Sequence, residues 1–402
     1  MKILQINKYL KIVGGAETYM FQLSKALKEL NVEVKFWGME DSENIVNDFL
    51  GLEAKNVDYK NLSILNKATS VINTIYSKDN RQKLAKVLDK YQPDIVHIHN
   101  YNFQLTPSIL PEIKKRGIKV VQTIHDSQMV CPYHRLYNFQ RDQTCTKCVK
   151  GSFVNCIKDK CFDGSLFKSA VGAFESAFYH KRGFYDKYVD VYISPSEFLA
   201  NLVRERIDKK IIVIPNFTEV KTDLDLDIEK EEFYLYYGRI SEEKGIIDFL
   251  DHFVKTNLKL LIIGKGSLEE SVINKTKDND NIRYLGPKYG RDLFNIVKKA
   301  KYVIQPSKGF ENCPMTVIES FALGVPVIGS NHSGFMDLIQ NGETGYLLDF
   351  SDMESALKHL LKIDKKPTKH LKKNIDEYFK DNLSRQVHMN KIMSVYNKLT
   401  TS

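Results

Sequence analysis

Two glutamates, Glu311 and Glu319, stand eight positions apart on either side of a proline. Proline suits the first position of a helix, because its missing N–H would be unpaired there, so a helix is expected to begin at Pro314 and to end before Gly324. Glu311 then lies in the loop before the helix and Glu319 lies in its second turn. The free amides at the start of the helix favour a phosphate; they belong to Asn312, Cys313, Met315 and Thr316.

The two carboxylates suit a different part of a ligand, because they accept hydrogen bonds from hydroxyls such as those of a ribose and a hexose. This pattern therefore predicts a site for a sugar, a diphosphate and a nucleoside laid across a helix N-terminus. The alternative is an ordinary surface helix with two solvated glutamates.

A pair of basic residues follows the strand expected over residues 233–237. Arg239 and Lys244 lie five positions apart, after Gly238, on a loop that opens a helix at Gly245. Such a pair can converge on a diphosphate, and the alternative is a solvated basic loop. A second glycine turn, at Gly264, follows the next expected strand.

The N-terminal part of the chain carries a glycine loop and several histidines. Gly14 and Gly15 stand between a strand and an amphipathic helix, where glycine lets backbone amides approach a phosphate; without other motifs a plain turn would be the better interpretation. His97, His99 and His125 lie at the carboxyl ends of expected parallel strands, where ligands of open α/β sheets bind. The alternative for each is a structural histidine.

Four cysteines fall within 17 positions: Cys145, Cys148, Cys156 and Cys161. Their spacing suits a structural zinc site in a cysteine-rich insert over residues 131–161. Free thiols, or a disulfide in an oxidising compartment, are the alternatives. The next segment, residues 166–184, is a helical pattern with aromatic and basic residues, which suits either a membrane surface or a helix with one core face and one solvated face.

The whole chain has 402 residues, a net charge of +9 and no apolar run long enough to span a membrane. With no cleavable signal pattern at the N-terminus, an intracellular protein is expected. The surplus of lysine and arginine suits anionic lipid, nucleic acid or a phosphorylated substrate, or is merely a basic surface.

Strands and helices alternate in two successive series, which predicts an α/β protein with two Rossmann-like domains. We expect an N-terminal domain over residues 1–217, a C-terminal domain over residues 218–384, and a closing helix over residues 385–402. The acidic stretch over residues 223–232 is expected to be the linker.

The segment around the two glutamates resembles the E-x7-E signature of retaining glycosyltransferases with the GT-B fold, specifically family 4. The residues that carry this resemblance are Phe310, Glu311, Pro314, Glu319, Ala322 and Gly324 to Pro326. The order of the other motifs extends it over nearly the full chain. The resemblance implies two Rossmann-like domains that face each other across a cleft, with a C-terminal helix that crosses back to the first domain.

The resemblance also implies roles for individual residues. The glycine loop at Gly14 and Gly15 would face the donor diphosphate, and His125 would contact the transferred sugar. Arg239 and Lys244 match the G-R-x4-K-G element that holds the donor phosphates. One departure is Cys313, which stands where family members commonly have a small residue, so a thiol is expected beside the sugar.

The implied function is transfer of a hexose-type sugar from a nucleotide-diphosphate sugar to a saccharide or polyprenyl-linked saccharide, in bacterial surface polysaccharide synthesis. No metal or other cofactor is expected for catalysis, and no nucleic-acid partner. The expected location is the cytoplasm, with peripheral contact with an anionic membrane as a further expectation. The alternatives are another GT-B chemistry, such as epimerisation or phosphorolysis, and a sugar-nucleotide-binding protein without turnover.

Overall fold

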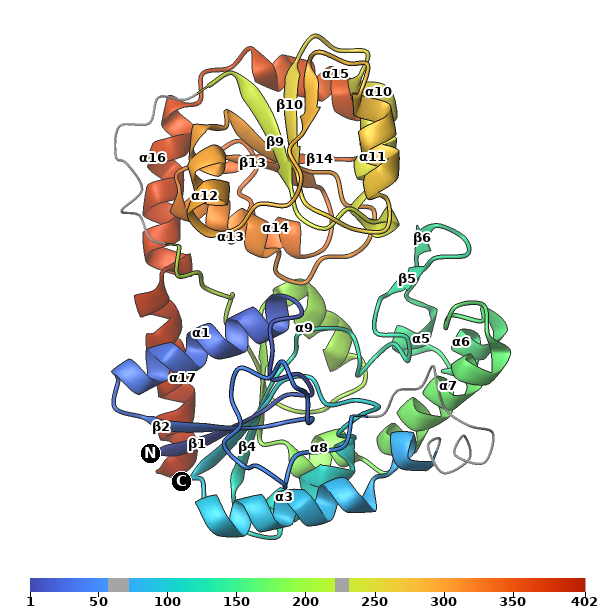
Figure 1. Ribbon diagram of the computed structural model, residues 1–402, viewed down its shortest axis with the longest axis vertical. Helices are drawn as coiled ribbons and strands as arrows, with labels where there is room; N and C mark the ends of the chain where they lie inside the picture. Colours follow the sequence, from blue (N-terminus) through green and yellow to red (C-terminus); the bar gives the residue numbers. More distant parts are fainter. Residues whose placement is uncertain (57–71, 221–230, 402) are drawn as a thin grey trace. The chain divides into compact units, whose positions relative to one another are not determined.

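The computed structural model describes residues 1–56, 72–220 and 231–401. They form two compact units, each of which is described here by itself. Unit 1 comprises Met1–Arg135, Thr146–Ile214 and Met389–Ser402, and unit 2 comprises Leu136–Cys145 and Pro215–His388. Each unit contains a six-stranded parallel sheet with helices packed on it (Figure 1), so the predicted α/β class with two Rossmann-like domains is confirmed.

The sheet of unit 1 has the strand order β2-β1-β3-β4-β7-β8. The strand order reverses between β1 and β3, and in such sheets the crevice for a ligand lies at the carboxyl ends of the strands that flank the reversal. The strands are β1 (Lys2–Ile6), β2 (Glu33–Trp37), β3 (Ile95–Ile98), β4 (Lys119–Thr123), β7 (Val191–Ser194) and β8 (Ile211–Val213).

The helices of unit 1 are α1 (Gly15–Glu29), α3 (Lys78–Tyr91), α4 (Leu110–Lys114), α5 (Lys147–Lys150), α6 (Val154–Lys158), α7 (Leu166–Lys181), α8 (Phe184–Tyr188) and α9 (Glu197–Arg204), with a 3-10 turn over Pro107–Ile109. Of these helices, α5 to α8 lie between β4 and β7 in the chain, and α5 and α6 belong to the cysteine-rich insert. The closing helix α17 (Arg385–Thr400) is joined to this unit from Met389 onward.

The sheet of unit 2 has the order β11-β10-β9-β12-β13-β14, which is the order of dinucleotide-binding sheets, with its reversal between β9 and β12. The strands are β9 (Phe233–Tyr237), β10 (Lys259–Ile263), β11 (Ile282–Tyr284), β12 (Tyr302–Gln305), β13 (Val327–Ser330) and β14 (Gly345–Leu348). The helices are α10 (Ile246–Phe253), α11 (Glu269–Thr276), α12 (Gly290–Lys299), α13 (Met315–Ala322), α14 (Gly334–Leu338), α15 (Met353–Asp364) and α16 (Lys369–Tyr378). In Figure 1, α10, α11 and α15 lie on one side of this sheet and α12, α13 and α16 lie on the other.

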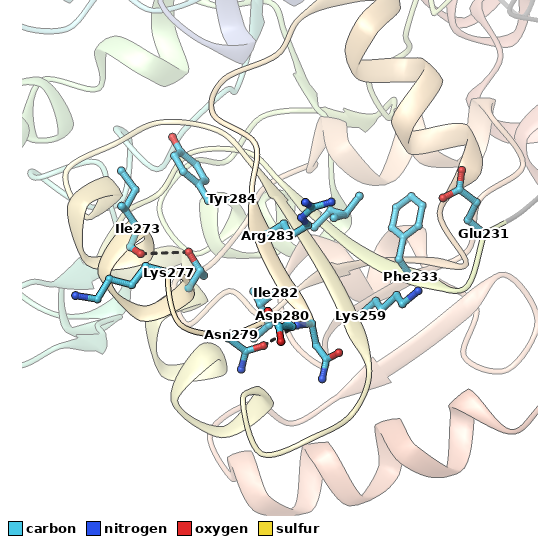
Figure 2. Close-up of a pocket in the computed structure, with 13 residues that line it drawn as sticks. Glu231, Phe233, Lys259, Ile273, Lys277, Asn279, Asp280, Ile282, Arg283 and Tyr284 are labelled. Carbon is cyan, nitrogen blue, oxygen red and sulfur yellow. Dashed lines mark hydrogen bonds between the residues drawn. The ribbon is translucent and has the colours of Figure 1, made fainter.

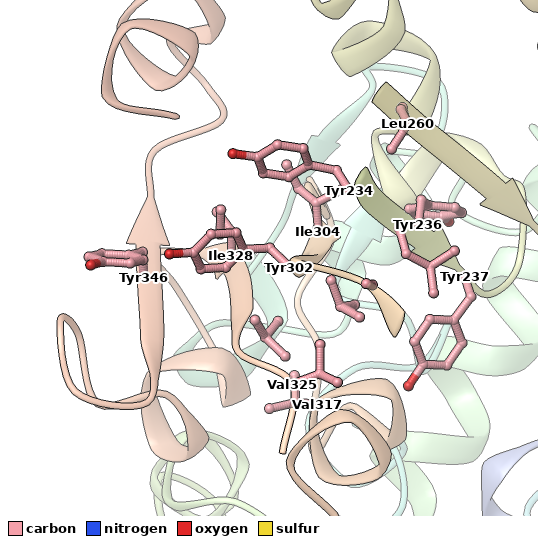
Figure 3. Packing of buried hydrophobic residues seen from close by; sticks show 14 of the residues in the cluster. Tyr234, Tyr236, Tyr237, Leu260, Tyr302, Ile304, Val317, Val325, Ile328 and Tyr346 are labelled. Atoms are coloured by element: carbon pink, nitrogen blue, oxygen red, sulfur yellow. The ribbon is translucent and has the colours of Figure 1, made fainter. Parts of the chain in front are cut away.

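Strand β9 is buried along its whole length because both faces of the central sheet are covered. Its three tyrosines, drawn in Figure 3, are packed in the hydrophobic core, and each hydroxyl reaches a hydrogen-bond acceptor. Tyr234 donates to Asp364 Oδ1 at 2.9 Å, Tyr236 to the carbonyl of Arg239 at 2.6 Å, and Tyr237 to the carbonyl of Thr316 at 2.7 Å. Strand β9 therefore fixes two segments that were expected to bind the ligand, the loop that carries Arg239 and the first turn of α13 that contains Thr316.

Several boundaries differ from those expected. The units divide between Ile214 and Pro215, near the expected residue 217, and the hairpin of β5 (Tyr137–Asn138) and β6 (Gln143–Thr144) groups with unit 2 although it belongs to the cysteine-rich insert. The linker was expected over residues 223–232, and residues 223–230 of it lie outside the described residues.

The long helical pattern expected over residues 375–399 is interrupted. Helix α16 ends at Tyr378, a π-helical turn covers Phe379–Leu383, and Ser384 is extended before α17 begins. The first turn of α17 stays with unit 2, where His388 Nδ1 hydrogen-bonds the carbonyl of Pro215 at 2.8 Å. In the part of the chain that is described, no helix is both long enough and apolar enough to cross a membrane.

Candidate active site

In unit 2, the loops after β9 and β12 meet where the strand order of the sheet reverses. Lys244 lies in a short 3-10 turn, Glu242–Lys244, that leads into α10, and Glu311 lies in the loop before α13. Lys244 Nζ is 2.5 Å from Glu311 Oε1, and both side chains are largely buried. Ser307 Oγ donates to the same carboxylate oxygen at 3.2 Å. An ammonium and a carboxylate thus face each other where a ligand of such a sheet would bind.

The pKa of Glu311 reflects this pairing. Burial raises it, but the ammonium of Lys244 and its hydrogen bond outweigh burial, so the pKa lies below the ordinary value. Glu311 is therefore ionised at neutral pH. In contrast, burial raises the pKa of Glu319 to about 7, with the Tyr237 hydroxyl acting in the opposite direction.

Arg239 lies on the same loop as Lys244, but the carboxylate that it pairs with is that of Glu243 rather than that of Glu311. Its side chain is 56% exposed, and its guanidinium is 3.9 Å from Glu243 Oε1. Its charge still contributes to the lower pKa of Glu311. An exposed guanidinium beside a buried ammonium gives this loop two cations that can bind neighbouring phosphates.

Two glycines bring the ends of β9 and β10 together. Gly238 and Gly264 both have positive φ angles, +144° and +148°. A Cβ atom on Gly264 would lie 1.8 Å from the carbonyl oxygen of Gly238, so only glycine fits. The expected Gly264 turn is therefore required to pack against the loop that carries Arg239.

A hydrogen-bonded chain orients the backbone around Glu311. The Glu311 amide donates to Ser333 Oγ at 3.0 Å, and Ser333 Oγ is 3.1 Å from His332 Nδ1. His332 Nε2 donates to the carbonyl of Ser307 at 3.0 Å. Burial lowers the pKa of His332, which agrees with a neutral ring that accepts at Nδ1 and donates at Nε2. The Glu311 loop is thus linked to the ends of β12 and β13.

Helix α13 begins one residue later than expected. Pro314 is extended, with ψ at 114°, and is the N-cap residue, whereas Gly324 follows the helix at φ +65° as expected for its C′ residue. Met315 and Thr316 occupy the first turn, and Glu319 the second. The amides of Asn312, Cys313, Met315 and Thr316 therefore surround the helix start.

Cys313 precedes Pro314 in the loop before α13. It is buried within the hydrophobic core of unit 2, and burial raises the pKa of its thiol to about 12. That the thiol lies beside the bound sugar stays a prediction, which substitution of Cys313 by alanine or glycine and measurement of donor preference test.

In unit 1, the glycine loop follows β1 and is tied to the start of α1. Gly14 is the extended N-cap of α1, and its amide donates to Glu17 Oε2 at 3.0 Å. Asn7, directly after β1, donates through Nδ2 to Glu17 Oε1 at 3.0 Å and accepts from the Asn100 amide at 2.9 Å. Within the described residues, a Cβ atom on Gly15 would meet no atom closer than 4 Å. The packing of the chain therefore does not explain glycine at position 15.

His125 follows β4 and belongs to a chain of polar side chains at the same edge of the sheet. His125 Nε2 is 2.8 Å from His99 Nδ1, and His99 Nε2 is 2.7 Å from Gln5 Oε1. Because the Gln5 oxygen only accepts, His99 donates from Nε2 and accepts at Nδ1 from His125. Burial lowers the pKa of His125 to about 4, with Asp126 opposing, so this ring is neutral at neutral pH. Its remaining nitrogen, Nδ1, is then the unprotonated one.

His97 has a structural position. Its Nδ1 is 2.6 Å from the hydroxyl of Tyr396 in α17, and its Nε2 is 2.7 Å from Thr123 Oγ1. It is completely buried. His97 is therefore a structural histidine, which was the alternative to a ligand-binding role.

The structure does not bring the four expected zinc ligands together. Cys148, Cys156 and Cys161 contribute to a small core with Phe153 and Ala173, whereas Cys145 groups with unit 2. All six cysteines lie in the described part of the chain, and none of them forms a disulfide bond there. Among the described residues, no group of three or more His, Cys, Asp or Glu side chains is arranged to hold a metal ion. A structural zinc remains a prediction that metal analysis can test.

Sequence reasoning did not identify several residues of these networks: Asn7, Glu17, Gln5, Ser307, His332 and Ser333. Four of them, Asn7, Ser307, His332 and Ser333, lie within three residues after a parallel strand, which is the one signal that would have indicated them. Their polar atoms contact backbone groups, and such contacts leave no motif in the sequence.

A separate cavity of about 690 Å³ lies in unit 2 at the opposite edge of the sheet (Figure 2). Its lining includes Phe233 and Lys259, the first residues of β9 and β10, together with Lys277 and Arg283. The Lys244–Glu311 pair lies beyond the carboxyl ends of these strands, so the cavity is not part of the candidate site.

Two family models match the chain, one on each half. The model described as Glycosyltransferase Family 4 matches residues 13–221, and the model described as Glycosyl transferases group 1 matches residues 222–381. Together with the two parallel-sheet units, these matches define a glycosyltransferase with the GT-B fold. The chain belongs to glycosyltransferase family 4.

Solved structures support the fold. A sucrose-phosphate synthase from Thermosynechococcus elongatus has a TM-score of 0.72 at 16% identity, with 100% of this chain and 99% of that chain covered. The Anabaena protein HepE, solved in complex with UDP and glucose, has a TM-score of 0.63 at 13% identity and covers 99% of this chain and 100% of its own.

Curated relatives are distant. An uncharacterized glycosyltransferase of Methanocaldococcus jannaschii is 22% identical over 90% of this chain and 88% of its own length. A galactosyltransferase of Escherichia coli, whose name gives a GlcNAc-diphosphoundecaprenol acceptor, is 25% identical over 46% of this chain and 54% of its own length. For several of the relatives that it matches, this chain spans only about half their length.

Proposed function

We propose that this chain is a retaining glycosyltransferase that moves a hexose-type sugar from a nucleotide-diphosphate sugar to a saccharide or lipid-linked saccharide. The observation that carries the proposal is the Lys244–Glu311 pair, 2.5 Å apart at the strand-order reversal of unit 2. The structural neighbour that binds UDP and glucose, and the relative named for a diphosphoundecaprenol acceptor, support the classes of donor and acceptor.

The chemical problem is departure of a nucleoside diphosphate from the anomeric carbon. Negative charge develops on the leaving phosphate, and preorganised cations and amides directed at such charge usually make the largest contribution to catalysis. Lys244 and Arg239 supply the cations, and the first turn of α13 supplies the amides. When the donor binds, its phosphate competes with Glu311 for the ammonium of Lys244, which frees the carboxylate for the sugar hydroxyls.

The other residues bind the remaining parts of the donor. Glu319, in the second turn of α13, accepts hydrogen bonds from the ribose hydroxyls. Gly14 and Gly15 admit the diphosphate close to the start of α1, and His125 contacts the transferred sugar. The anomeric configuration is retained because the acceptor hydroxyl attacks the same face of the sugar from which the nucleotide leaves. The leaving phosphate helps to deprotonate this hydroxyl. The two cations stabilise the leaving group, so we propose that turnover needs no metal.

We further propose that the enzyme works in bacterial surface polysaccharide synthesis, on the cytoplasmic side of the cell membrane and in peripheral contact with it. A polyprenyl-linked acceptor would be presented there.

The test begins with a panel of UDP-, GDP- and ADP-sugars, whose binding is measured by calorimetry. With the donor identified, Lys244→Ala is expected to lower kcat by about 100-fold or more, because a charged donor to the leaving group is lost. The control is Lys358→Ala, an exposed lysine on α15. Release of free nucleotide only when acceptor is present distinguishes transfer from epimerisation. The assignment is wrong if Lys244→Ala transfers sugar as fast as the control does.

A further inference from the structure

Helix α7 has the reverse of the usual distribution of polar and apolar side chains. Its buried face carries Ser169, Gly172, Ala173, Glu175, Ser176 and Tyr179. Its outward face is apolar: Phe167 is 65% exposed and Phe174 is 59% exposed. A surface helix normally turns its apolar stripe toward the core, so this distribution needs an explanation.

The polar residues are directed inward because they have partners there. Ser169 Oγ accepts from the amide of Phe162 at 3.1 Å, and His180 Nε2 hydrogen-bonds the carbonyl of Met129 at 2.6 Å. Tyr179 hydrogen-bonds the carbonyl of Ile75. Gly172 packs against the ring of Phe162, since a Cβ atom there would lie 2.6 Å from it. These contacts fix the rotation of α7, and its apolar side chains must therefore face outward.

The outward side chains form one continuous stripe, which we call the α7 face. Helical spacing of three and four residues aligns its members, which are Phe167, Ala170, Val171, Phe174, Ala177, Phe178 and Lys181. The rings of Phe174 and Phe178 are 6.3 Å apart, and the guanidinium of Arg182 lies 3.8 Å from the ring of Phe178. The apolar stripe thus ends in two cations, Lys181 and Arg182.

The segment that contains the α7 face has more exposed basic than acidic side chains; three of its lysines form ion pairs, Lys147 with Asp159, Lys150 with Glu205 and Lys168 with Asp163. Over residues 146–182, the exposed basic side chains are Lys147, Lys150, Lys158, Lys160, Lys168, Lys181 and Arg182, whereas Asp163 is the exposed acidic one. The other two acidic residues of this segment, Asp159 and Glu175, are buried. Exposed aromatic side chains among exposed lysines and arginines are complementary to an anionic lipid surface, in which the rings enter the headgroup region and the cations bind phosphate.

We propose that the α7 face is the membrane-docking surface of this protein and that it lies on an anionic bilayer. The proposal rests on the proposed function in that a lipid-linked acceptor is presented at such a surface. Helices α5, α6 and α7 lie side by side (Figure 1), so the cysteine-rich insert forms the platform that carries this face.

The test is co-sedimentation of the full-length protein with vesicles of phosphatidylglycerol and phosphatidylcholine or of phosphatidylcholine alone. We expect binding to the anionic vesicles, weakened by salt, and little binding to the neutral ones. The double substitution Phe167→Ser with Phe174→Ser should weaken binding about tenfold or more, because two exposed rings lose their burial in lipid. Lys181→Glu with Arg182→Glu should also weaken it.

Matched controls lie on unit 2. Ile273→Ser with Leu361→Ser changes two other exposed apolar residues, and Lys358→Glu with Lys362→Glu changes two exposed lysines on α15. Both control proteins should bind vesicles as the unmodified protein does. Transfer to a soluble acceptor should be unchanged in the Phe167 and Phe174 variant, which separates docking from catalysis.

Three results would overturn the proposal: no binding of the unmodified protein to anionic vesicles, equal binding by the serine variant, or a dimer without vesicles that this variant converts to a monomer. The last result would make the α7 face an interface between two copies. Vesicle binding is measured without a sugar donor. If the protein proved to have no transferase activity, the co-sedimentation test of the α7 face would therefore still be valid.

Discussion

At the scale of single residues, the site depends on a few buried charges whose partners determine their protonation. Glu311 is ionised because Lys244 outweighs its burial, and His125 is neutral because burial dominates. The role of His125 further depends on which ring nitrogen carries the proton. The chain from Gln5 through His99 sets this tautomer.

Substitution Gln5→Leu tests the tautomer. It removes the acceptor for His99 Nε2–H, so the His99 and His125 rings are free to exchange donor and acceptor roles. We expect kcat to fall about fivefold, since one hydrogen bond contributes about 1 kcal/mol and 1.4 kcal/mol corresponds to a factor of ten. The KM for the donor should change less, and the pH profile of kcat should shift.

The control for Gln5→Leu is Gln122→Leu, which changes a buried glutamine on β4 whose oxygen accepts from Tyr101 rather than from a histidine. This control should affect stability and leave the pH profile unchanged. The tautomer argument fails if both variants behave alike in kcat and in pH profile.

The buried carboxyl of Glu175 should make stability depend on pH. Burial raises its pKa from 4.5 to about 8, so the folded chain keeps a proton that the unfolded chain releases. Stability should therefore fall as the pH rises from about 4.5 to about 8, and then level off. Glu175→Gln removes the ionisable group, and we expect it to match the unmodified protein at pH 4 and to exceed it at pH 9 by roughly 5 kcal/mol.

Urea unfolding across this pH range measures the difference. Glu197→Gln on α9 is the control, because this side chain is 50% exposed. A Glu175→Gln protein with the same pH dependence as the control would show that the carboxyl does not titrate as its burial indicates.

At the scale of elements, the loops that follow the strands contain two kinds of glycine. At one kind, packing of the chain excludes a side chain; at the other, packing would allow one, and we propose that a ligand requires the glycine. Gly264 has no room for a side chain beside Gly238, whereas Gly15 has open space on all sides within the described residues. A site requirement and a packing requirement can therefore be separated experimentally.

We expect Gly15→Ala to leave the melting temperature unchanged within about 2 °C, since no atom obstructs the new methyl group and alanine suits a helix. The donor KM should rise, because the methyl group stands where the diphosphate approaches the start of α1. Gly264→Ala should instead lower the melting temperature strongly. A Gly15→Ala enzyme with unchanged donor affinity would remove this loop from the site.

At the scale of the whole molecule, the closing helix α17 is part of the first unit from Met389 onward. Tyr396 on α17 hydrogen-bonds His97 at the centre of the unit 1 sheet, although 299 positions separate them in sequence. Tyr396→Phe leaves a buried histidine nitrogen without this partner, and we expect a loss of about 1 to 3 kcal/mol in unfolding free energy. Tyr289→Phe, at a position that is 68% exposed, is the control and should change it little. Equal stabilities of the two variants would contradict this role for the helix.

The sequence by itself determined the α/β class, the two Rossmann-like units and most strand ends, because buried parallel strands are apolar runs punctuated by glycine and polar residues. It also indicated Lys244, Glu311 and His125, since each lies in the connection that follows a parallel strand. Local patterns of this kind are contained in a few neighbouring residues.

Only the tertiary structure decided which side chains meet. It paired Lys244 with Glu311, buried Cys313 and rotated α7 so that Phe167 and Phe174 face outward. These outcomes depend on partners far away in the chain, such as Phe162 and Met129 for α7. The periodicity of α7 predicts a helix with two faces, but the hydrogen bonds of its polar face decide which one is buried.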